Sequence, residues 1–296
     1  MANPSRTGAE STATPHRRAY EAELARAEAP RPVALVTGAA RRIGRAIALE
    51  LAQAGFDIAL HHRGGQGESA GDAEAEATAS ELRAHGARVE IFAADFADPQ
   101  ATNELLGRVA QAFGRVDALV NNASRFEYDS PAAFDADLLE AMTRSNLGAP
   151  LVLAQALARQ VGRQEAFAPE RRITPCVVNL LDQKLQNPNP DYLSYTLTKA
   201  ALQHATMLLA RAFAPALRVC AVSPGITLVS GPMAESEFAQ AHTLTPLGRS
   251  STPEDIARAV RFVLESPAIT GTTIVVDGGQ HLLPQPRDVM FLARNS

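Results

Sequence analysis

The sequence has 296 residues, of which 46% are hydrophobic and 20% are charged, enough for one large α/β domain with a substantial core. The formal net charge of −4 argues against nucleic acid or an anionic membrane surface as a partner. Its two cysteines, Cys176 and Cys220, form neither a disulfide framework nor a metal cluster, so we expect no metal and a cytoplasmic location.

The N-terminal residues 1–30 are polar and rich in proline and alanine, without the apolar centre of a secretory signal. We expect them to form a flexible extension. No apolar run approaches the length of a transmembrane helix. Residues 31–280 are predicted to form one domain, and residues 281–296 a tail that can lie at a subunit interface.

From Pro32 onward, short apolar runs alternate with amphipathic stretches. The runs predict strands at Val33–Thr37, Asp57–His61, Arg88–Ala93, Asp117–Asn121, Ile173–Leu181, Arg218–Val222 and Thr272–Val276. Helical spacing predicts helices at Ile43–Ala54, Glu68–His85, Pro99–Phe113, Phe134–Arg159 (as one helix or two), Ser194–Ala214 and Pro253–Glu265. This alternation indicates an α/β fold with a doubly wound, Rossmann-type parallel sheet of about seven strands and helices on both faces.

The first strand runs into the segment TGAARRIG (residues 37–44), which opens the first helix. Gly38 permits a tight turn, and Gly44 permits close packing of helix on strand. The helix N-terminus offers N–H groups to a pyrophosphate. The strict G-x-G-x-x-G spacing is absent because Arg42 occupies the place of the middle glycine. The glycine spacing alone would also fit an ordinary strand–helix turn.

The second strand ends without the acidic residue that binds the ribose hydroxyls of NAD. Arg63 stands there instead, and Arg42 is available from the first loop. Two guanidinium groups suit a 2′-phosphate, so we expect NADPH as the cofactor. The alternative is that both arginines belong only to the solvated surface, in a chain where all but two of the 28 cationic residues are arginine.

Tyr195 and Lys199 stand four positions apart in a predicted helix, so both lie on one face. An ammonium beside a phenol favours the phenolate, and we expect Lys199 to lower the pKa of Tyr195 toward neutrality. The only other lysine, Lys184, has no such partner and is expected on the loop surface or at the pocket rim.

Together these motifs resemble the short-chain dehydrogenase/reductase family from about Pro32 to Gly279. Further matching segments are Asp95 after the third strand, Asn121-Asn122-Ala123, Asn146, Ser223-Pro224-Gly225 and Val276-Asp277-Gly278-Gly279. The resemblance implies that the asparagine segment supports the sheet beside the adenosine, that the acidic residue contacts adenine, and that the Pro-Gly segment lies beside the nicotinamide. The expected cofactor residues are Gly38, Arg41, Arg42, Ile43, Arg63, Asp95, Phe96, Asn121, Ala123, Ser124, Tyr195, Lys199, Pro224, Gly225 and Ile226.

Thirteen residues before the tyrosine, where the family usually has serine, this chain has Asp182. The aspartate, Arg42, the basic end of the second strand and Phe126 are similar to the pteridine reductase and dihydromonapterin reductase branch, where that phenylalanine stacks on a pterin. The catalytic residues implied are Asp182, Tyr195 and Lys199. The substrate residues implied are Arg42, Ser124, Phe126, Asp182 and Tyr195.

A pterin C=N bond needs a hydride on carbon and a proton on nitrogen. Tyr195 is the expected proton donor, assisted by Asp182, whose pKa a semi-enclosed site can raise. Phe126 has an alternative role in core packing, and Asp182 one as a helix cap. The segment Thr227–Thr245 is expected to be the substrate lid. The resemblance further implies a homotetramer.

Two other functions fit the same motifs. One is an NADPH-dependent ketone or 3-oxoacyl-thioester reductase of this fold. The other is a non-catalytic NADPH-binding regulator, which would not need Tyr195 and Lys199.

Overall fold

The structure is a computed structural model that describes residues 30–64, 70–162, 172–229 and 234–292. The predicted N-terminal extension lies outside these residues, apart from its last residue. Seven strands form one parallel sheet in the order β3-β2-β1-β4-β5-β6-β7. Their bounds are β1 Val33–Val36, β2 Asp57–His62, β3 Val89–Ala93, β4 Ala118–Asn121, β5 Cys176–Leu180, β6 Arg218–Pro224 and β7 Thr273–Val276. The predicted fold class is confirmed, and every predicted strand is present to within three residues at each end.

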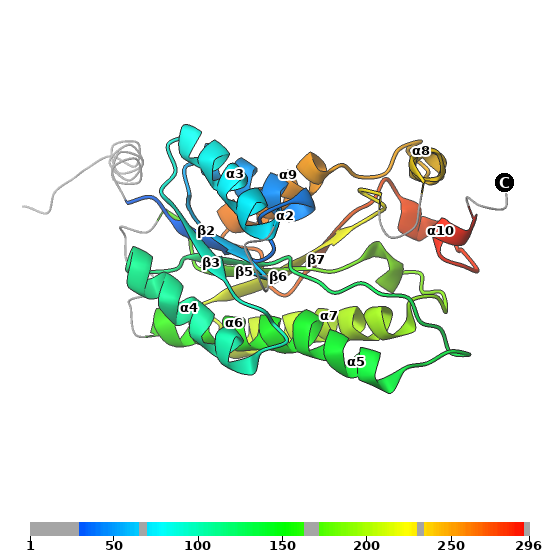
Figure 1. Ribbon diagram of the computed structural model, residues 1–296, viewed down its shortest axis with the longest axis horizontal. Coiled ribbons are helices and arrows are strands. Elements are labelled where there is room, and N and C mark those ends of the chain that lie inside the picture. The colour runs from blue at the N-terminus through cyan, green and yellow to red at the C-terminus, as the bar shows by residue number, and fades with distance from the viewer. Residues whose placement is uncertain (1–29, 65–69, 163–171, 230–233, 293–296) are drawn as a thin grey trace, which may run out of the picture.

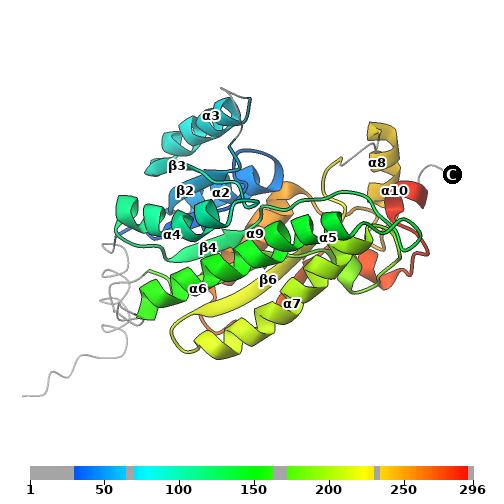
Figure 2. The same cartoon turned by 60° about the horizontal axis from the view of Figure 1, so that its bottom comes forward.

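Two layers of helices cover the sheet (Figure 1). One layer contains α2 (Arg42–Gln53), α3 (Ala70–Ala84) and α9 (Pro253–Glu265). The other contains α4 (Pro99–Phe113), α5 (Ala136–Thr143), α6 (Ala149–Gly162) and α7 (Leu193–Phe213). The short helices α8 (Glu235–Thr243) and α10 (Val289–Leu292) lie together beyond one end of the sheet, as Figure 2 shows from a second direction.

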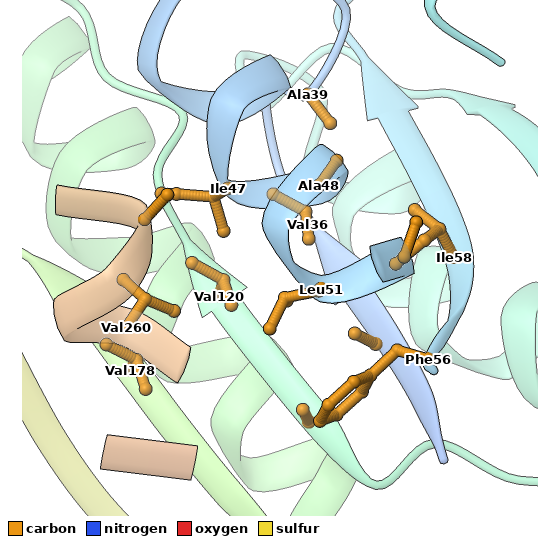
Figure 3. Packing of buried hydrophobic residues seen from close by; sticks show 14 of the residues in the cluster. Val36, Ala39, Ile47, Ala48, Leu51, Phe56, Ile58, Val120, Val178 and Val260 are labelled. Carbon is orange, nitrogen blue, oxygen red and sulfur yellow. The ribbon is translucent and has the colours of Figure 1, made fainter. Parts of the chain in front are cut away.

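The core consists of two apolar layers, one on each face of the sheet. In the first layer Ile47 and Leu51 of α2 lie over Val36 and Val120 of the sheet, beside Val260 of α9 (Figure 3). Strands that are covered on both faces are mostly apolar, and β1 and β4 are buried throughout, with Asn121 as their one polar residue. This burial makes the sheet a rigid base for the loops at its carboxyl edge.

Local sequence signals fix several helix ends. The Asp98 side chain accepts the N–H of Gln100 at the start of α4, with Pro99 at the first helical position. Thr252 and Asp255 cap each other's backbone N–H groups at the start of α9, where Pro253 has the same place.

The region predicted as one helix or two, Phe134–Arg159, is continuous. α5 passes through a π-helical turn, Arg144–Gly148, directly into α6. The helix α8 was not predicted, and it lies inside the segment expected to be the substrate lid.

Candidate active site

In the described part of the chain, a cavity lies where the loops after β1, β4, β5 and β6 converge at the carboxyl edge of the sheet. Its volume is about 220 Å³. Its lining brings together all three residues predicted to be catalytic with the aromatic and arginine predicted for the substrate, namely Asp182, Tyr195, Lys199, Phe126 and Arg42. Open parallel sheets bind their ligands at this edge.

Tyr195 and Asp182 are joined directly. The Tyr195 hydroxyl donates to Oδ2 of Asp182 at 3.0 Å, and Oδ1 of the same carboxylate accepts the backbone N–H of Lys184 at 2.8 Å. Asp182 follows β5 and caps the short 3-10 turn Gln183–Leu185, whereas Tyr195 lies in the first turn of α7. The cap role that stood as an alternative for Asp182 is therefore present in addition to its contact with the tyrosine.

Burial sets the protonation of this pair. Burial raises the pKa of Asp182 above its usual value, against the opposing hydrogen bond from the Lys184 backbone, and the nearby Asp288 raises it further. Burial and then the Asp182 carboxylate also raise the pKa of Tyr195 well above 10. The expected fall of the tyrosine pKa toward neutrality is wrong for this structure. The carboxylate bonds the hydroxyl directly, whereas the Lys199 ammonium lies 5.7 Å from the ring centroid.

Lys199 is buried, and its ammonium donates to the carbonyl of Leu180 at 2.7 Å. Burial lowers the pKa of Lys199 to about 8. The side chain is therefore still mostly protonated at neutral pH, and it holds a positive charge beneath the tyrosine ring.

The helix α7, which carries Tyr195 and Lys199, is capped by a residue from another part of the chain. Tyr192, at the N-cap position of α7, has a left-handed backbone and makes no side-chain cap. Asp129, from the loop after β4, accepts the backbone N–H of Ser194 at 3.0 Å and its hydroxyl at 2.5 Å. A buried carboxylate at a helix N-terminus satisfies the free N–H groups and suits the helix dipole.

Asn146 ties the same loop to α7 from the other side. Its side chain accepts the N–H of Arg125 at 2.8 Å, donates to the Arg125 carbonyl at 2.9 Å, and donates to the Thr198 hydroxyl at 3.2 Å. The residue lies in the π-helical turn between α5 and α6 and is fully buried. Such a turn often marks a functional site because it redirects one side chain.

The segment TGAARRIG (residues 37–44) follows β1 and leads into α2, as predicted; we call it the phosphate loop. Gly38 has φ +65°, a conformation that strains any residue with a side chain. A Cβ on Gly44 would lie 2.1 Å from the Gly38 carbonyl oxygen, so this position requires glycine as well. The start of α2 has no side-chain cap, and its first N–H groups are available to an anion.

His61, at the end of β2, holds this loop in place, and this role was not predicted from the sequence. Its Nδ1 accepts the N–H of Gly38 at 3.1 Å, so Nε2 carries the proton and donates to the Ala94 carbonyl at 2.9 Å. The ring stacks on Phe96, with centroids 4.6 Å apart. Burial lowers the pKa of His61 to about 4, which keeps the ring neutral. The only available signal was a histidine at the end of an apolar strand.

The other predicted cofactor residues follow the ends of β1, β2 and β3. Arg41, Arg42 and Arg63 are exposed, and no ion pair joins Arg42 or Arg63 to another described residue. Asp95 is exposed and its carboxylate accepts the N–H of Ala97, while Phe96 is mostly covered by its stack on His61. These side chains lie outside the lining of the cavity, except for Arg42, which lines it together with Ile43.

The loop after β4 has two functions. Asn121 points into the sheet, where its amide donates to Asn179 at 2.8 Å. Asn122 lines the cavity and donates to the carbonyls of Thr37 and Gly38, fixing the phosphate loop. Ala123 donates its N–H to the Thr37 hydroxyl, and Ser124 lines the cavity with its hydroxyl directed at Asn146. The role of Asn122 was not predicted.

Phe126 lies on the wall of the cavity and is 38% exposed. Its ring stacks on Tyr192 at 4.3 Å and meets Tyr195 edge to face at 4.7 Å. The alternative of burial in the core is therefore wrong, because the ring belongs to an aromatic wall that also includes Tyr192 and Tyr195.

The far side of the cavity is closed by the loop after β6 and by the tail. Pro224, Gly225 and Ile226 line it at the place predicted for the nicotinamide, followed by Thr227 and Leu228 from the expected lid. In the tail, Asp288 and Val289 also line the cavity, and Phe291 lies against Tyr128. The described part of the tail thus packs on its own chain.

Lys184 is not on the loop surface. It is 4% exposed, because its ammonium donates to the Asp191 carbonyl at 2.5 Å and pairs with Asp288 at 3.1 Å. The missing partner was in the tail, more than 100 positions away in the sequence.

Three comparisons relate the chain to known proteins. The sequence matches the family described as Enoyl-(Acyl carrier protein) reductase over residues 38–281. The 3-oxoacyl-[acyl-carrier-protein] reductase FabG of Staphylococcus epidermidis is 32% identical, over 84% of this chain and 98% of its own. An uncharacterized oxidoreductase of Mycobacterium tuberculosis is 35% identical, over 83% of this chain and 91% of its own. The crystal structure of FolM alternative dihydrofolate reductase 1 from Brucella canis, complexed with NADP, has a TM-score of 0.78 and 34% identity, and covers 88% of this chain and 98% of that one.

Proposed function

The chain belongs to the short-chain dehydrogenase/reductase family and is an NAD(P)-dependent oxidoreductase, and on this basis we propose that it reduces pterins with NADPH. The observation that carries the proposal is the 3.0 Å contact between the Tyr195 hydroxyl and Asp182 in a cavity walled by Phe126. An aspartate can supply a proton to a ring nitrogen, which a serine hydroxyl at the same place cannot do at neutral pH.

The residues fit a dinucleotide. The N-terminus of α2, open to an anion beside Gly38, would hold the pyrophosphate, and Pro224-Gly225-Ile226 would hold the nicotinamide ring near Tyr195. When bound, NADPH supplies the hydride that adds to the carbon of the substrate C=N bond.

The chain's own residues then handle the proton. As the C=N electron pair moves onto nitrogen, that atom takes the proton from the Tyr195 hydroxyl. The developing phenolate is stabilised by the Lys199 ammonium, and Asp182 in its protonated form returns a proton to the tyrosine oxygen. A raised pKa of Asp182 keeps part of this carboxyl protonated at a higher pH than usual.

The preference for NADPH rests on Arg42 and Arg63. Both guanidinium groups are exposed and neither forms an ion pair with another described residue, so both are available to a 2′-phosphate. The similarity to the Brucella FolM structure, which is a complex with NADP, supports the same assignment.

The preference for a pterin rests on the residues that line the cavity. A flat ring can lie against the exposed part of Phe126 with its reacting edge toward Tyr195 and Asp182, and its opposite edge toward Arg42 and Ser124. The 34% identity to a protein named as an alternative dihydrofolate reductase supports this choice. A 3-oxoacyl-thioester or ketone reductase remains the competing activity, supported by the 32% identity to FabG.

One panel of substrates tests the proposal. Purified protein is mixed with NADPH and with a dihydropterin, dihydrofolate, a 3-oxoacyl thioester or a diketone, and NADPH oxidation is followed by absorbance. We expect turnover with a dihydropterin at a kcat/KM at least tenfold above that with the carbonyl compounds. Faster reduction of the carbonyl compounds would assign the chain to the competing activity. Cofactor binding without turnover of any substrate would favour a regulator.

A further inference from the structure

The loop after β7 places one buried carboxamide at the catalytic cavity. The motif Val276-Asp277-Gly278-Gly279 is followed by Gln280, which begins the 3-10 turn Gln280–Leu282. Gln280 is 5% exposed, and it lines the cavity that contains Tyr195 and Lys199. Neither the motif nor this glutamine has a part in the proton transfer, so their position at the cavity calls for another role.

Only one half of the Gln280 carboxamide is bonded. Its Oε1 accepts the backbone N–H of Ile226 at 3.1 Å, and an N–H can bond only to the oxygen of an amide, so the orientation of the group is fixed. Its Nε2 has no hydrogen-bond partner among the described residues, and it is not one of their fully enclosed polar atoms. Polar atoms of buried side chains are normally paired. Gln280 therefore presents an unused donor to the space that it lines.

Two turns that are bonded to each other hold this carboxamide in place. The buried Asp277 carboxylate accepts the backbone N–H of Gly279 at 2.9 Å and that of His281 at 2.7 Å. On the facing side, Gly225 donates its N–H to the Val276 carbonyl at 2.9 Å, and a Cβ on Gly225 would lie 2.7 Å from that of Asp277. A donor that is already held in this way needs little reordering to bind a ligand.

The neighbours of Gln280 indicate which group it meets. Nε2 is attached to the same carbon as Oε1, so it lies beside Ile226, on the wall where the proposed function places the nicotinamide ring. Thr227, the polar residue next along that wall, already donates to the Gly225 carbonyl at 2.9 Å and bonds to Ser251 at 2.8 Å. The hydrogen-bond acceptor of a reduced nicotinamide ring is its carboxamide oxygen, which needs a donor once water is excluded.

We propose that Gln280 is a further cofactor-binding residue, whose Nε2 donates to the carboxamide oxygen of the nicotinamide. This inference rests on the place that the proposed function gives the nicotinamide, and it does not depend on which substrate is reduced. The contact stops the carboxamide from rotating, and so helps to hold one face of the ring toward Tyr195. It also gives the motif before Gln280 a role, which is to position this side chain.

The test measures the binding of NADPH and of its thioamide analogue, in which sulfur, a weak acceptor, replaces the carboxamide oxygen. Isothermal titration calorimetry of the full-length protein gives both dissociation constants without any substrate. The unmodified protein should bind the analogue about tenfold more weakly than NADPH, the effect of one hydrogen bond lost in a buried site. Gln280→Leu removes the donor, so it should bind the two cofactors within about twofold of each other.

Gln280→Glu distinguishes binding of the cofactor from support of the loop. The ionised glutamate keeps an oxygen for the Ile226 N–H but has no donor, so this variant should also lose the preference for NADPH over the analogue. Gln186→Leu is the matched control. It replaces an exposed carboxamide outside the cavity lining and should keep the preference.

Three results would overturn the inference. One is equal binding of the two cofactors by the unmodified protein, and another is a preference for NADPH that persists in both Gln280 variants. The third is that Gln280→Leu weakens both cofactors equally and Gln280→Glu restores them, which would mean that the residue only supports the loop after β6. The substrate panel would still decide the proposed function in each case. If the unmodified protein binds neither cofactor, the proposed function fails as well.

Discussion

The Tyr195 hydroxyl and the Asp182 carboxylate share a hydrogen bond of 3.0 Å across the gap between α7 and the end of β5. The other carboxylate oxygen is bound by a backbone N–H, so the aspartate cannot turn away from the tyrosine without losing two contacts. The Asp182 carboxyl group is therefore held where it can exchange a proton with the Tyr195 hydroxyl.

Replacing Asp182 with serine removes the carboxyl group that is proposed to supply this proton. Asp182→Ser should lower kcat for a dihydropterin by about 100-fold, the usual contribution of a general acid. The dissociation constant for NADPH should stay within about twofold, because the hydrogen bonds of Asp182 are to Tyr195 and Lys184 and none joins it to the phosphate loop among the described residues. Stopped-flow measurement of NADPH oxidation gives kcat, and fluorescence titration with NADPH gives the dissociation constant. Asp137→Ser, an exposed acidic residue in α5, serves as control, and unchanged turnover in Asp182→Ser would exclude the acid role.

The same carboxyl group should affect stability in a pH-dependent way. Because the pKa of Asp182 is higher in the folded chain than in the unfolded chain, its contribution to stability is complete below the unfolded pKa and is lost as the pH rises through the folded pKa. Asp182→Asn removes this loss and keeps an oxygen for the Lys184 N–H. In calorimetry, the Tm of Asp182→Asn minus the Tm of the unmodified protein should increase from pH 4 to pH 8. A difference that stays constant over this range would contradict the raised pKa of Asp182.

The proposed preference for NADPH over NADH can be tested at Arg63. Arg63→Ala should raise KM for NADPH about tenfold, the value of a charge-assisted contact with a phosphate, and should leave KM for NADH nearly unchanged. Steady-state kinetics with both cofactors give the comparison. Arg211→Ala, in the last turn of α7, removes an exposed arginine remote from the loop and should change neither constant. Equal effects of Arg63→Ala on both cofactors would mean that the residue does not recognise the 2′-phosphate.

His61 links the phosphate loop to protein stability. His61→Phe keeps an aromatic ring against Phe96 but leaves the Gly38 N–H and the Ala94 carbonyl without their partner, at a cost of about 1–3 kcal/mol. We expect a lower Tm at neutral pH and a KM for NADPH raised several-fold. Replacement of the exposed His85 by Phe should do neither.

The pH dependence gives a second test of His61. Its pKa is lowered to about 4, so the stability tied to the neutral ring is complete above pH 6.5 and is lost as the pH falls toward 4. The shift corresponds to about 3 kcal/mol. Denaturant titrations of the unmodified protein should show this acid-side loss, and His61→Phe should lack it. If the stability of both proteins falls equally as the pH is lowered, the loss comes from titratable groups other than His61.

The positions of the strands along the chain and the shared helix face of Tyr195 and Lys199 could be predicted from the sequence because they depend on short-range patterns. Fully apolar runs mark strands covered on both faces, and the spacing of Tyr195 and Lys199 is set by one helical turn. N-cap residues such as Asp98 can be predicted from the sequence in the same way.

Contacts between distant segments could not be predicted. Lys184 was expected on the loop surface or at the pocket rim. It does line the cavity, but its burial could not be predicted because its partner Asp288 lies in the tail and no local pattern joins the two. The same holds for Asn122, whose side chain reaches the loop after β1. The expected effect of Lys199 on the pKa of Tyr195 was wrong because the phenol is buried and the Asp182 carboxylate bonds its hydroxyl, and spacing in the sequence shows neither.

The capping of α7 by Asp129 has a consequence for how the molecule opens. The helix lacks a side-chain cap of its own, so its first turn, which includes Tyr195, is anchored by a carboxylate from the loop after β4. When that loop fluctuates away, the amides at the start of α7 lose their acceptor at the same moment. Hydrogen exchange at Ser194 and its neighbours should therefore follow that of the 122–135 loop in one cooperative step, instead of the gradual fraying of a free helix end.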